Sequence, residues 1–323
     1  MSGIALFLKL ALGQVPARFL ATLKAEVARL DIEAYAPGLY IGSSGIAWTL
    51  LALGLNQEAE QLMEQTQRSP LLYENADLFY GSAGWGLTNL YFYHHLNDEK
   101  YLERATATFH QLRSQLTETP TGLCYQNTSD TYYGLAHGAA GIAYFMLKLY
   151  EASRQDLHRE YAQRLLAFDL ASAEPRPEYV LFSRSVHDRT YYPYWRTGSA
   201  GIGSIALRFY QSLRDESYLQ IARKTAHYLA GKYTVFPSNF LGMAGIGNFF
   251  VDLYRYDAEV RYLAEARRFA DRILLFTVEK PAGIVFPGEE LLRLSTDFGT
   301  GSAGTGLFLW RILNAGGVPY LDF

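Results

Sequence analysis

The sequence predicts an all-α fold, an α/α toroid in which seven inner helices are surrounded by seven outer ones. Three observations support this prediction: a Gly-x-x-Gly element recurs along the chain, an apolar run follows each copy, and amphipathic segments separate the runs. A repeated unit of this kind buries its apolar face only by stacking against its neighbours. Closing the stack into a ring leaves no apolar end exposed, which favours a toroid over an open array.

The glycine element defines seven repeats. The complete copies are Gly42-Ser-Ser-Gly45, Gly81-Ser-Ala-Gly84, Gly138-Ala-Ala-Gly141, Gly198-Ser-Ala-Gly201, Gly242-Met-Ala-Gly245 and Gly301-Ser-Ala-Gly304. The opening Ser2-Gly3-Ile4-Ala5 matches the second half of the element, so the first repeat is truncated. The spacing of the copies leaves room for two helices per repeat and, in the longer intervals, for a loop.

The segments between the apolar runs have the periodicity of amphipathic helices. In residues 257–274 the apolar positions 260, 263, 266, 270, 273 and 274 line one helical face, and Asp257 is the predicted N-cap. Similar segments cover residues 16–30, 98–116, 155–170 and 215–232. A run that is apolar all round predicts an inner helix, and an amphipathic segment predicts an outer one. Short strands are expected only in the longer loops, at Tyr179–Phe182 and Ile284–Phe286.

The repeated glycines have a structural interpretation. They let the backbone turn tightly into each inner helix and let neighbouring helices approach closely. A phosphate-binding loop is the alternative, but the element recurs along the whole chain and no Walker-type lysine follows any copy. The N-termini of the inner helices then meet at one mouth of the toroid, where their dipoles favour negative charge. Residues just before each glycine pair are expected to line that mouth.

Composition and charge exclude several classes of function. The 323 residues carry a net charge of −3 without a basic block, which does not favour binding to nucleic acid or to an anionic membrane. The single cysteine, Cys124, excludes an intramolecular disulfide and suits a reducing compartment. The apolar residues 1–12 lack a basic region and are too short to span a bilayer. We therefore expect a cytoplasmic protein, and the fixed repeat predicts one domain over residues 1–323.

Two positions in each repeat fall at the predicted mouth. The residue before the first glycine is Ile41, Tyr80, His137, Thr197, Leu241 or Thr300, and the residue four before it is Gly38, Asp77, Gly134, Tyr194, Ser238 or Asp297. His137 is the strongest candidate for proton transfer, because imidazole exchanges protons near neutral pH. The alternative is a structural histidine. Asp77 either orients this imidazole or caps its own loop.

The other candidates at the mouth are polar or aromatic. Arg196 either stabilises an enolate, binds a carboxylate or forms a salt bridge at the rim, and Tyr80 is expected to help hold His137. Four further residues are expected to contact the substrate: Tyr133, Tyr194, Thr197 and Asp297. For Asp297 the alternative is a cap of the last inner helix.

No cofactor or metal site is predicted from the histidines and the cysteine. The remaining histidines do not pair with Cys124 at a spacing typical of metal ligands; they are His94, His95, His110, His158, His187 and His227.

Three stretches resemble the lanthionine synthetase C-like cyclases. They are Asp77-Leu-Phe-Tyr-Gly-Ser-Ala-Gly, Ala136-His-Gly-Ala-Ala-Gly and Asp297-Phe-Gly-Thr-Gly-Ser-Ala-Gly, and the resemblance extends over essentially the whole chain. It implies an α/α toroid that adds a cysteine thiol to dehydroalanine or dehydrobutyrine within a precursor peptide. It also implies that His137 and Asp77 are the acid/base residues.

One departure from the family pattern indicates a subclass. Zinc-dependent members place a cysteine two before the glycine in one copy and Cys-His before it in the next, whereas this sequence has Arg196-Thr197 and Phe240-Leu241. The family's arginine, expected six before the glycine in the first of those copies, is replaced by Tyr192. The chain is therefore similar to the zinc-free cyclase domain of class III synthetases, in which a lyase and a kinase domain precede the cyclase. The truncated first repeat agrees with such an upstream partner.

The resemblance implies a mechanism and leaves alternatives open. The helix N-termini and Arg196 stabilise the thiolate and the enolate, while His137, held by Asp77 and Tyr80, exchanges the proton. Lanthionine and labionin products are not distinguished by the sequence. A non-catalytic scaffold, or a leader-peptide-binding domain for the kinase and lyase, is a second hypothesis. An α/α-barrel glycosidase or epimerase is a third, suggested by aromatic residues and carboxylates at the rim, although seven repeats weigh against it.

Overall fold

Helices of two kinds alternate along the chain. The computed structural model describes residues 1–127, 130–314 and 322–323, which divide into two compact units. The first unit comprises Met1–Ala171 and Ser185–His187, and the second comprises Ser172–Arg184 and Asp188–Phe323. Within the described residues, none of the helices is long and apolar enough to cross a bilayer.

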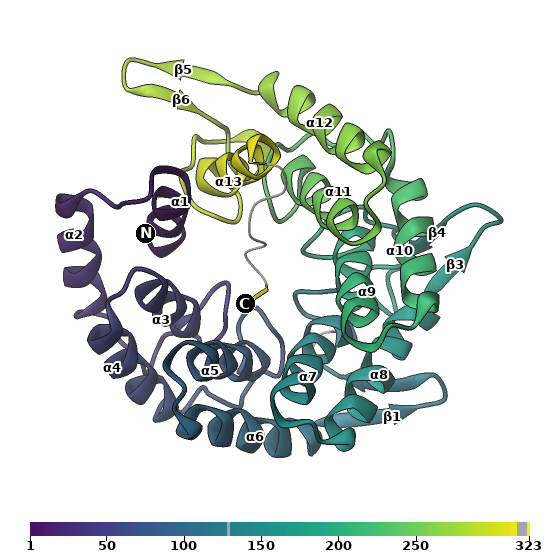
Figure 1. Ribbon diagram of the computed structural model, residues 1–323, viewed down its shortest axis with the longest axis horizontal. Coiled ribbons are helices and arrows are strands. Elements are labelled where there is room, and N and C mark those ends of the chain that lie inside the picture. Colours follow the sequence, from purple (N-terminus) through teal and green to yellow (C-terminus); the bar gives the residue numbers. More distant parts are fainter. Residues whose placement is uncertain (128–129, 315–321) are drawn as a thin grey trace. The chain divides into compact units, whose positions relative to one another are not determined.

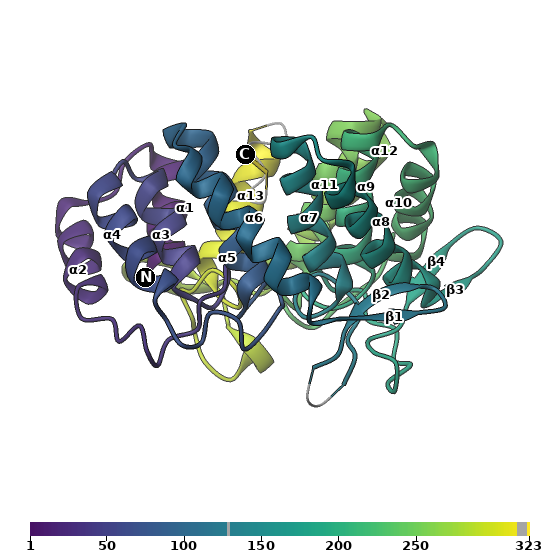
Figure 2. The same cartoon turned by 90° about the horizontal axis from the view of Figure 1, so that it is seen from below.

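The first unit contains eight helices and one hairpin among the residues described. Its elements are α1 (Ser2–Leu12), α2 (Ala17–Val27), α3 (Ser43–Ala52), α4 (Asn56–Gln67), α5 (Ser82–Leu96), α6 (Glu99–Arg113), β1 (Leu116–Thr119), β2 (Gly122–Tyr125), α7 (Ala139–Ser153) and α8 (Asp156–Ala171). Within this unit α3, α5 and α7 lie side by side, with α4, α6 and α8 in a second layer (Figure 1). The loops that lead into α3, α5 and α7 project from the same side of the helices, at the lower edge of Figure 2.

The second unit repeats the same plan. Its elements are β3 (Ala173–Pro175), β4 (Val180–Phe182), α9 (Ser199–Leu213), α10 (Glu216–Leu229), α11 (Met243–Asp257), α12 (Val260–Leu274), β5 (Val278–Lys280), β6 (Gly283–Val285), a 3₁₀ turn at Glu289–Leu291 and α13 (Ser302–Leu313). Helix α11 packs against α9 on one side and α13 on the other, and α10 and α12 cover them. The strands of both units form antiparallel two-stranded hairpins.

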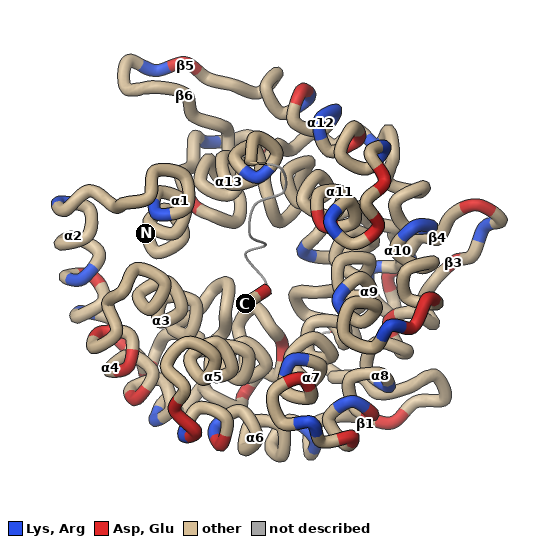
Figure 3. Tube along the Cα trace, in the orientation of Figure 1, with Lys and Arg blue, Asp and Glu red and all other residues tan. Residues whose placement is uncertain are grey.

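Burial and charge separate the two kinds of helix. Every residue of α5 from Ser82 to Phe92 is buried, whereas α6 buries only the stripe Tyr101, Ala105, Thr108, Phe109 and Leu112. Figure 3 shows the same division, because charged residues lie along α4 and α6 and none lies on α3 or α5. The helix that follows each glycine pair is therefore an inner helix, as the sequence predicts, and the amphipathic helix after it is an outer one.

Close contacts between neighbouring inner helices depend on glycine. A Cβ on Gly84 of α5 would lie 2.4 Å from the backbone nitrogen of Leu39, and one on Gly86 would lie 2.4 Å from the ring of Phe145 on α7. The same glycine–phenylalanine contact recurs between α9 and α11 and between α11 and α13. These contacts give the glycines the structural role that the sequence predicts.

Two predictions about the helices differ from the structure, which also has strands that were not predicted, including the hairpin of β1 and β2. The predicted N-cap Asp257 is wrong: Asp257 ends α11, the chain turns through Ala258 at a φ of 56°, and Glu259 precedes α12. The inner helix continues beyond its apolar run, through Arg255 and Tyr256. Six outer helices, rather than the predicted seven, occur among the described residues.

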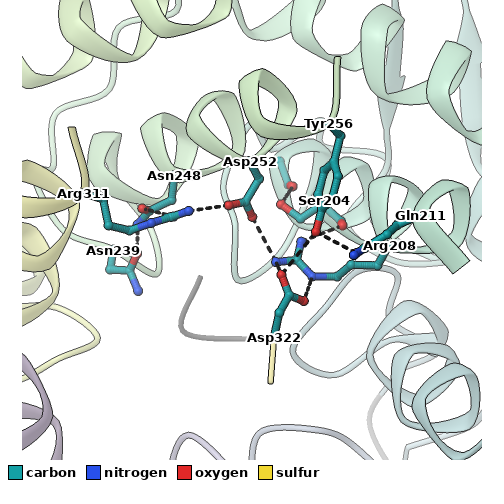
Figure 4. Close-up of polar contacts among 10 residues, drawn as sticks. Ser204, Arg208, Gln211, Asn239, Asn248, Asp252, Tyr256, Arg311 and Asp322 are labelled. Carbon is teal, nitrogen blue, oxygen red and sulfur yellow. Dashed lines mark hydrogen bonds and ion pairs between the residues drawn. The ribbon is translucent and has the colours of Figure 1, made fainter. Parts of the chain in front are cut away.

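A buried ion-pair network joins the three inner helices of the second unit (Figure 4). The carboxylate of Asp252 on α11 accepts hydrogen bonds from Arg208 on α9 and from Arg311 on α13. Arg311 also donates to Asn248, and Arg208 also donates to Asp322. Burial by itself raises the pKa of Asp252, but the two guanidinium groups outweigh it and hold that pKa below its usual range.

Replacing Gly86 by alanine tests the close packing of α5 and α7. The new methyl group overlaps the buried ring of Phe145, so we expect the free energy of unfolding to fall by about 1–3 kcal/mol. Adding Phe145→Leu makes room for the methyl group, so the double variant is expected to lose less than the sum of the two single variants. Chemical denaturation of the four proteins measures this coupling, and strict additivity would contradict the proposed contact.

Replacing Asp252 by alanine tests the ion-pair network. The change leaves Arg208 and Arg311 buried without the carboxylate between them, so we expect a loss of about 3–5 kcal/mol in the free energy of unfolding. Denaturant titration measures the loss. Asp271→Ala, at an exposed position of α12, is the matched control and is expected to change stability by less than about 0.5 kcal/mol.

Candidate active site

Two neighbouring loops of the first unit bring the predicted acid/base residues together. Asp77 lies in the loop before α5, and His137 lies in the loop before α7. The backbone N–H of Phe79 donates to the carbonyl of Ala136, which joins the two loops directly. The Nδ1 atom of His137 lies 2.8 Å from the Oδ2 atom of Asp77. The structure therefore brings these two predicted residues into contact.

The loop before α5 fixes the carboxylate of Asp77. Its side chain is 1% exposed. The N–H of Asp77 donates to the side-chain oxygen of Asn75 at 2.8 Å, and the Oδ1 atom of Asp77 accepts from the N–H of Tyr80 at 2.6 Å. One carboxylate oxygen thus closes the loop, and the other meets the imidazole.

The position of the carboxylate determines which nitrogen of His137 can exchange a proton with a substrate. An ionised carboxylate only accepts hydrogen bonds, so Nδ1 carries the proton that is shared with Asp77. In the neutral ring Nε2 then holds the lone pair and can accept a proton. The paired carboxylate stabilises the imidazolium that results. This is the arrangement of a general base with an orienting partner.

Aromatic rings surround the imidazole of His137. The ring of Tyr80 is nearly parallel to it, at 13° with centroids 5.4 Å apart. Phe79 and Tyr132 contact it at tilted and edge-on angles, with centroids at 5.5 and 6.0 Å. The side chain of His137 remains 15% exposed. The predicted neighbour Tyr80 is therefore at the imidazole, and so is Tyr132, a rim aromatic whose contact with His137 was not predicted.

The predicted residue Tyr133 lies on the other side of its loop. Its ring packs against Phe168 of α8, with centroids 5.1 Å apart. The structure therefore places Tyr132, rather than Tyr133, against His137, because successive side chains of this extended segment point in different directions.

A buried carboxylate on α8 was not among the residues predicted from the sequence. Asp169 is fully buried, and its Oδ2 atom accepts hydrogen bonds from the N–H groups of Gly134 at 2.7 Å and Ala140 at 2.9 Å. Burial raises the pKa of Asp169 to about 7, although these N–H groups act in the opposite direction. A signal existed in the sequence, since Asp169 occupies the same helical face as the buried Ala162, Leu165 and Leu166.

Three other predicted residues lie in the loop before α9, in the second unit. The N–H of Arg196 donates to the carbonyl of Phe240 at 2.9 Å, and Arg196 and Thr197 are both half-buried. Burial, together with the nearby phenol of Tyr192, raises the pKa of Tyr194. The structure supports a partly enclosed position for all three residues and leaves their roles as predictions.

Asp297 closes its loop in the same way as Asp77. Its Oδ1 atom accepts from the N–H of Thr300 at 2.6 Å, as Asp77 accepts from Tyr80. Its Oδ2 atom, however, accepts from the hydroxyls of Thr300 and Ser295. Burial raises the pKa of Asp297, but these hydrogen bonds outweigh it and lower the pKa overall. Both oxygens therefore accept hydrogen bonds within the loop before α13. Asp297 does not cap that helix, because the N-cap residue is Gly301 and no side chain bonds there.

The positions at which the family resemblance implies zinc ligands do not fit a zinc ion. Arg196 and Thr197 occupy one copy, and Phe240 and Leu241 occupy the next. The ring of Phe240 is 5% exposed and stacks on Trp195, with the ring of Phe298 at its edge. Zinc requires thiolate, imidazole or carboxylate ligands, which these side chains do not supply. Throughout the described ranges there is no group of three His, Cys, Asp or Glu side chains that could hold a metal.

The sequence of the chain matches known proteins of one family. The profile of the lanthionine synthetase C-like proteins matches residues 1–321. The Probable SapB synthase of Streptomyces coelicolor is 28% identical over 303 residues, which cover 88% of this chain and 30% of that protein. The chain thus corresponds to less than a third of the length of this curated relative.

Solved structures share the fold. Nisin cyclase matches with a TM-score of 0.71 at 17% identity, over 97% of this chain and 87% of that chain. The α-1,6-mannanase of Salegentibacter sp. HEL1_6 matches with a TM-score of 0.59 at 15% identity, over 92% of this chain and 98% of that chain. At these identities the likeness concerns the fold alone, and it confirms the predicted α/α class. The match to the family profile over residues 1–321 shows that the chain belongs to the lanthionine synthetase C-like family.

Proposed function

We propose that this chain is a lanthipeptide cyclase. It adds cysteine thiols to dehydroalanine or dehydrobutyrine residues of a dehydrated precursor peptide and forms lanthionine or methyllanthionine rings. The observation that carries the proposal is the contact between His137 and Asp77 in the loops before two inner helices of a lanthionine synthetase C-like chain. The precursor peptide is therefore the proposed substrate.

The proposed reaction transfers one proton and forms one bond. The Nε2 atom of His137 takes the proton from the cysteine thiol, and the thiolate attacks the β-carbon of the dehydro residue. The carbon–sulfur bond forms as the double-bond electrons move toward the carbonyl and give an enolate. His137 then returns the proton to the α-carbon, so the enzyme ends in its starting state.

The other residues predicted from the sequence have supporting roles in this proposal. Asp77 stabilises the imidazolium, and Tyr80 holds the ring by stacking on it. Arg196 and the N-termini of the inner helices supply positive potential for the thiolate and the enolate. Tyr133, Tyr194, Thr197 and Asp297 remain the proposed contacts of the peptide, although the ring of Tyr133 also packs on Phe168 and both oxygens of Asp297 also accept hydrogen bonds within their loop.

We further propose that the reaction does not need zinc and that the chain is the cyclase domain of a class III synthetase. Phe240 and the other residues at the zinc positions supply none of the family's ligands. The proposed partners are kinase and lyase domains of the same synthetase. The proposal is consistent with the match to the Probable SapB synthase, of which this chain covers only 30%. Labionin forms in place of lanthionine if the enolate attacks a second dehydro residue. A cytoplasmic location remains part of the proposal.

A glycosidase function is less well supported, although mannanases share the fold. An inactive variant of the Salegentibacter mannanase carries substitutions at two consecutive aspartates. The present sequence contains no two consecutive aspartates. The two carboxylates at the predicted mouth, Asp77 and Asp297, each close their own loop instead. A non-catalytic scaffold or leader-binding domain is the remaining alternative.

Replacing His137 by alanine tests the catalytic proposal. We expect the rate of cyclisation to fall about 10²- to 10⁴-fold, because the proton carrier is lost. Cyclisation does not change the mass of the peptide but removes free thiols, so alkylation followed by mass spectrometry counts the rings. His110→Ala, at an exposed position of α6, is the matched control. A folded His137→Ala protein that cyclises at the wild-type rate would contradict the catalytic role of His137, whereas wild-type protein that cyclises the peptide no faster than buffer would favour the scaffold hypothesis.

Replacing Asp77 by asparagine tests whether the two residues act as a unit. The amide cannot stabilise an imidazolium as a carboxylate does, so we expect a rate reduction of about 100-fold. In a His137→Ala background the same change is expected to reduce the rate little further, because the proton carrier is already absent. The alkylation assay on the single and double variants provides the comparison. Multiplicative losses would show that Asp77 does not act through His137.

A further inference from the structure

Asp169, on the outer helix α8, contacts the segment 134–140, which carries His137 and is called the catalytic loop. Its Oδ2 atom accepts the N–H of Gly134 at 2.7 Å and the N–H of Ala140 at 2.9 Å. These donors lie three residues before and three residues after His137. A single buried oxygen therefore ties both ends of the segment that carries the imidazole.

The backbone of this segment needs such a tie. Gly134 has a φ of 103°, a conformation that glycine adopts readily and other residues rarely adopt. A Cβ on Gly138 would lie 2.4 Å from the carbonyl carbon of Tyr133, so the loop folds closely on itself. The N–H groups of Gly134 and Ala140 are buried in this tight loop, where a donor without an acceptor would destabilise the fold. Asp169 supplies the acceptor for both.

Four of the other five complete glycine elements have a serine after the first glycine, and the fifth has Met243. The hydroxyls of Ser43, Ser199 and Ser302 bond to segments outside their own loops, whereas that of Ser82 donates to the carbonyl of Asn75 in the loop before α5. The copy with His137 has Ala139 at this position and hence no hydroxyl. In this copy the buried carboxylate of Asp169 joins the loop to α8 instead, through its hydrogen bonds to Gly134 and Ala140.

We propose that Asp169 is a positioning residue for His137, which fixes the catalytic loop through its hydrogen bonds to Gly134 and Ala140. It does not touch the substrate and acts only through the loop. With the loop held, Nδ1 of His137 stays within hydrogen-bond distance of Asp77, so that Nε2 is directed toward the reacting thiol. This inference rests on the proposed cyclase function, but the effect of Asp169 on the position of the His137 imidazole can be tested without measuring activity.

The first test compares three substitutions of Asp169 in the cyclisation assay. Asp169→Ala removes the acceptor, and we expect the rate to fall about 10- to 100-fold, as misplacement of a catalytic group does. Asp169→Asn keeps an acceptor oxygen and is expected to restore most of the rate. Asp169→Glu displaces the carboxylate by one methylene and serves where the alanine variant does not fold; its rate is expected to lie between these two. Asp156→Ala, at an exposed position on the same helix, is the matched control.

The second test observes the imidazole directly. In protein with ¹³C-labelled histidines, the His137 signal is identified by its absence from His137→Ala. We expect this signal to shift in Asp169→Ala and Asp169→Glu, and to stay near its wild-type position in Asp169→Asn. Wild-type rates and an unchanged signal in the alanine or glutamate variant would overturn the inference. A shifted signal in a chain whose His137→Ala variant remains fully active would overturn the proposed catalytic role of His137 and leave the structural effect of Asp169 on the loop standing.

The pH dependence of stability provides an independent check that the carboxylate is buried. Burial raises the pKa of Asp169 to about 7, and the facing thiol of Cys124 on β2 has a raised pKa because of its own burial and because of this carboxylate. Since the pKa of Asp169 is higher in the folded than in the unfolded chain, its contribution to stability is full below about pH 4 and is lost as the pH rises through 7. The Tm of the wild type is therefore expected to fall relative to that of Asp169→Asn between pH 5 and pH 8. A constant difference in Tm would contradict the buried site.

Discussion

The close approach of neighbouring inner helices is the constraint on which the candidate site depends. Gly84 and Gly86 let α5 come so near to its neighbours that any side chain at these positions would overlap Leu39 or Phe145. Because α5 packs against α7, the loops that lead into these helices also lie together. The hydrogen bond from Phe79 to Ala136 is a direct consequence. Residues sixty positions apart in the sequence, Asp77 and His137, meet for this reason.

The repeats share one loop geometry and differ in how they use it. Asp77 and Asp297 both accept the backbone N–H of the residue three positions later. In the second unit the other oxygen of Asp297 is occupied by hydroxyl groups of its own loop, whereas the other oxygen of Asp77 meets an imidazole. A carboxylate that closes its own loop thus also contacts an imidazole where the next repeat supplies a histidine, and this pair is the acid/base unit that we propose. The loop of Asp77 therefore differs from that of Asp297 mainly in the imidazole that its second carboxylate oxygen contacts.

The features that the repeat determines could be predicted from the sequence, whereas those that depend on packing between layers could not. The inner helices, most outer helices and the pair His137 and Asp77 belong to the first group, because the glycine element fixes which positions fall at the helix N-termini. The contact of Tyr132 with His137 and that of Tyr133 with Phe168 belong to the second group, since they depend on how one extended segment is rotated. Asp169 was also missed, because a carboxylate on the apolar face of an outer helix has meaning only when its partner loop is known. The end of α11 was misplaced, since periodicity does not fix where a helix ends.

Asp169 and Asp252 show why burial alone does not determine the charge of a carboxylate. Both are buried on or against inner helices, yet the pKa of Asp169 is raised and that of Asp252 is lowered. Asp252 lies between the guanidinium groups of Arg208 and Arg311, whose charges outweigh the cost of desolvation. Among the groups that shift its pKa, Asp169 has backbone N–H donors instead, and these only partly offset that cost. Asp252 is suited to joining helices permanently, whereas Asp169 holds a loop with hydrogen bonds that need no fixed charge. A neutral acceptor can therefore replace Asp169, but not Asp252.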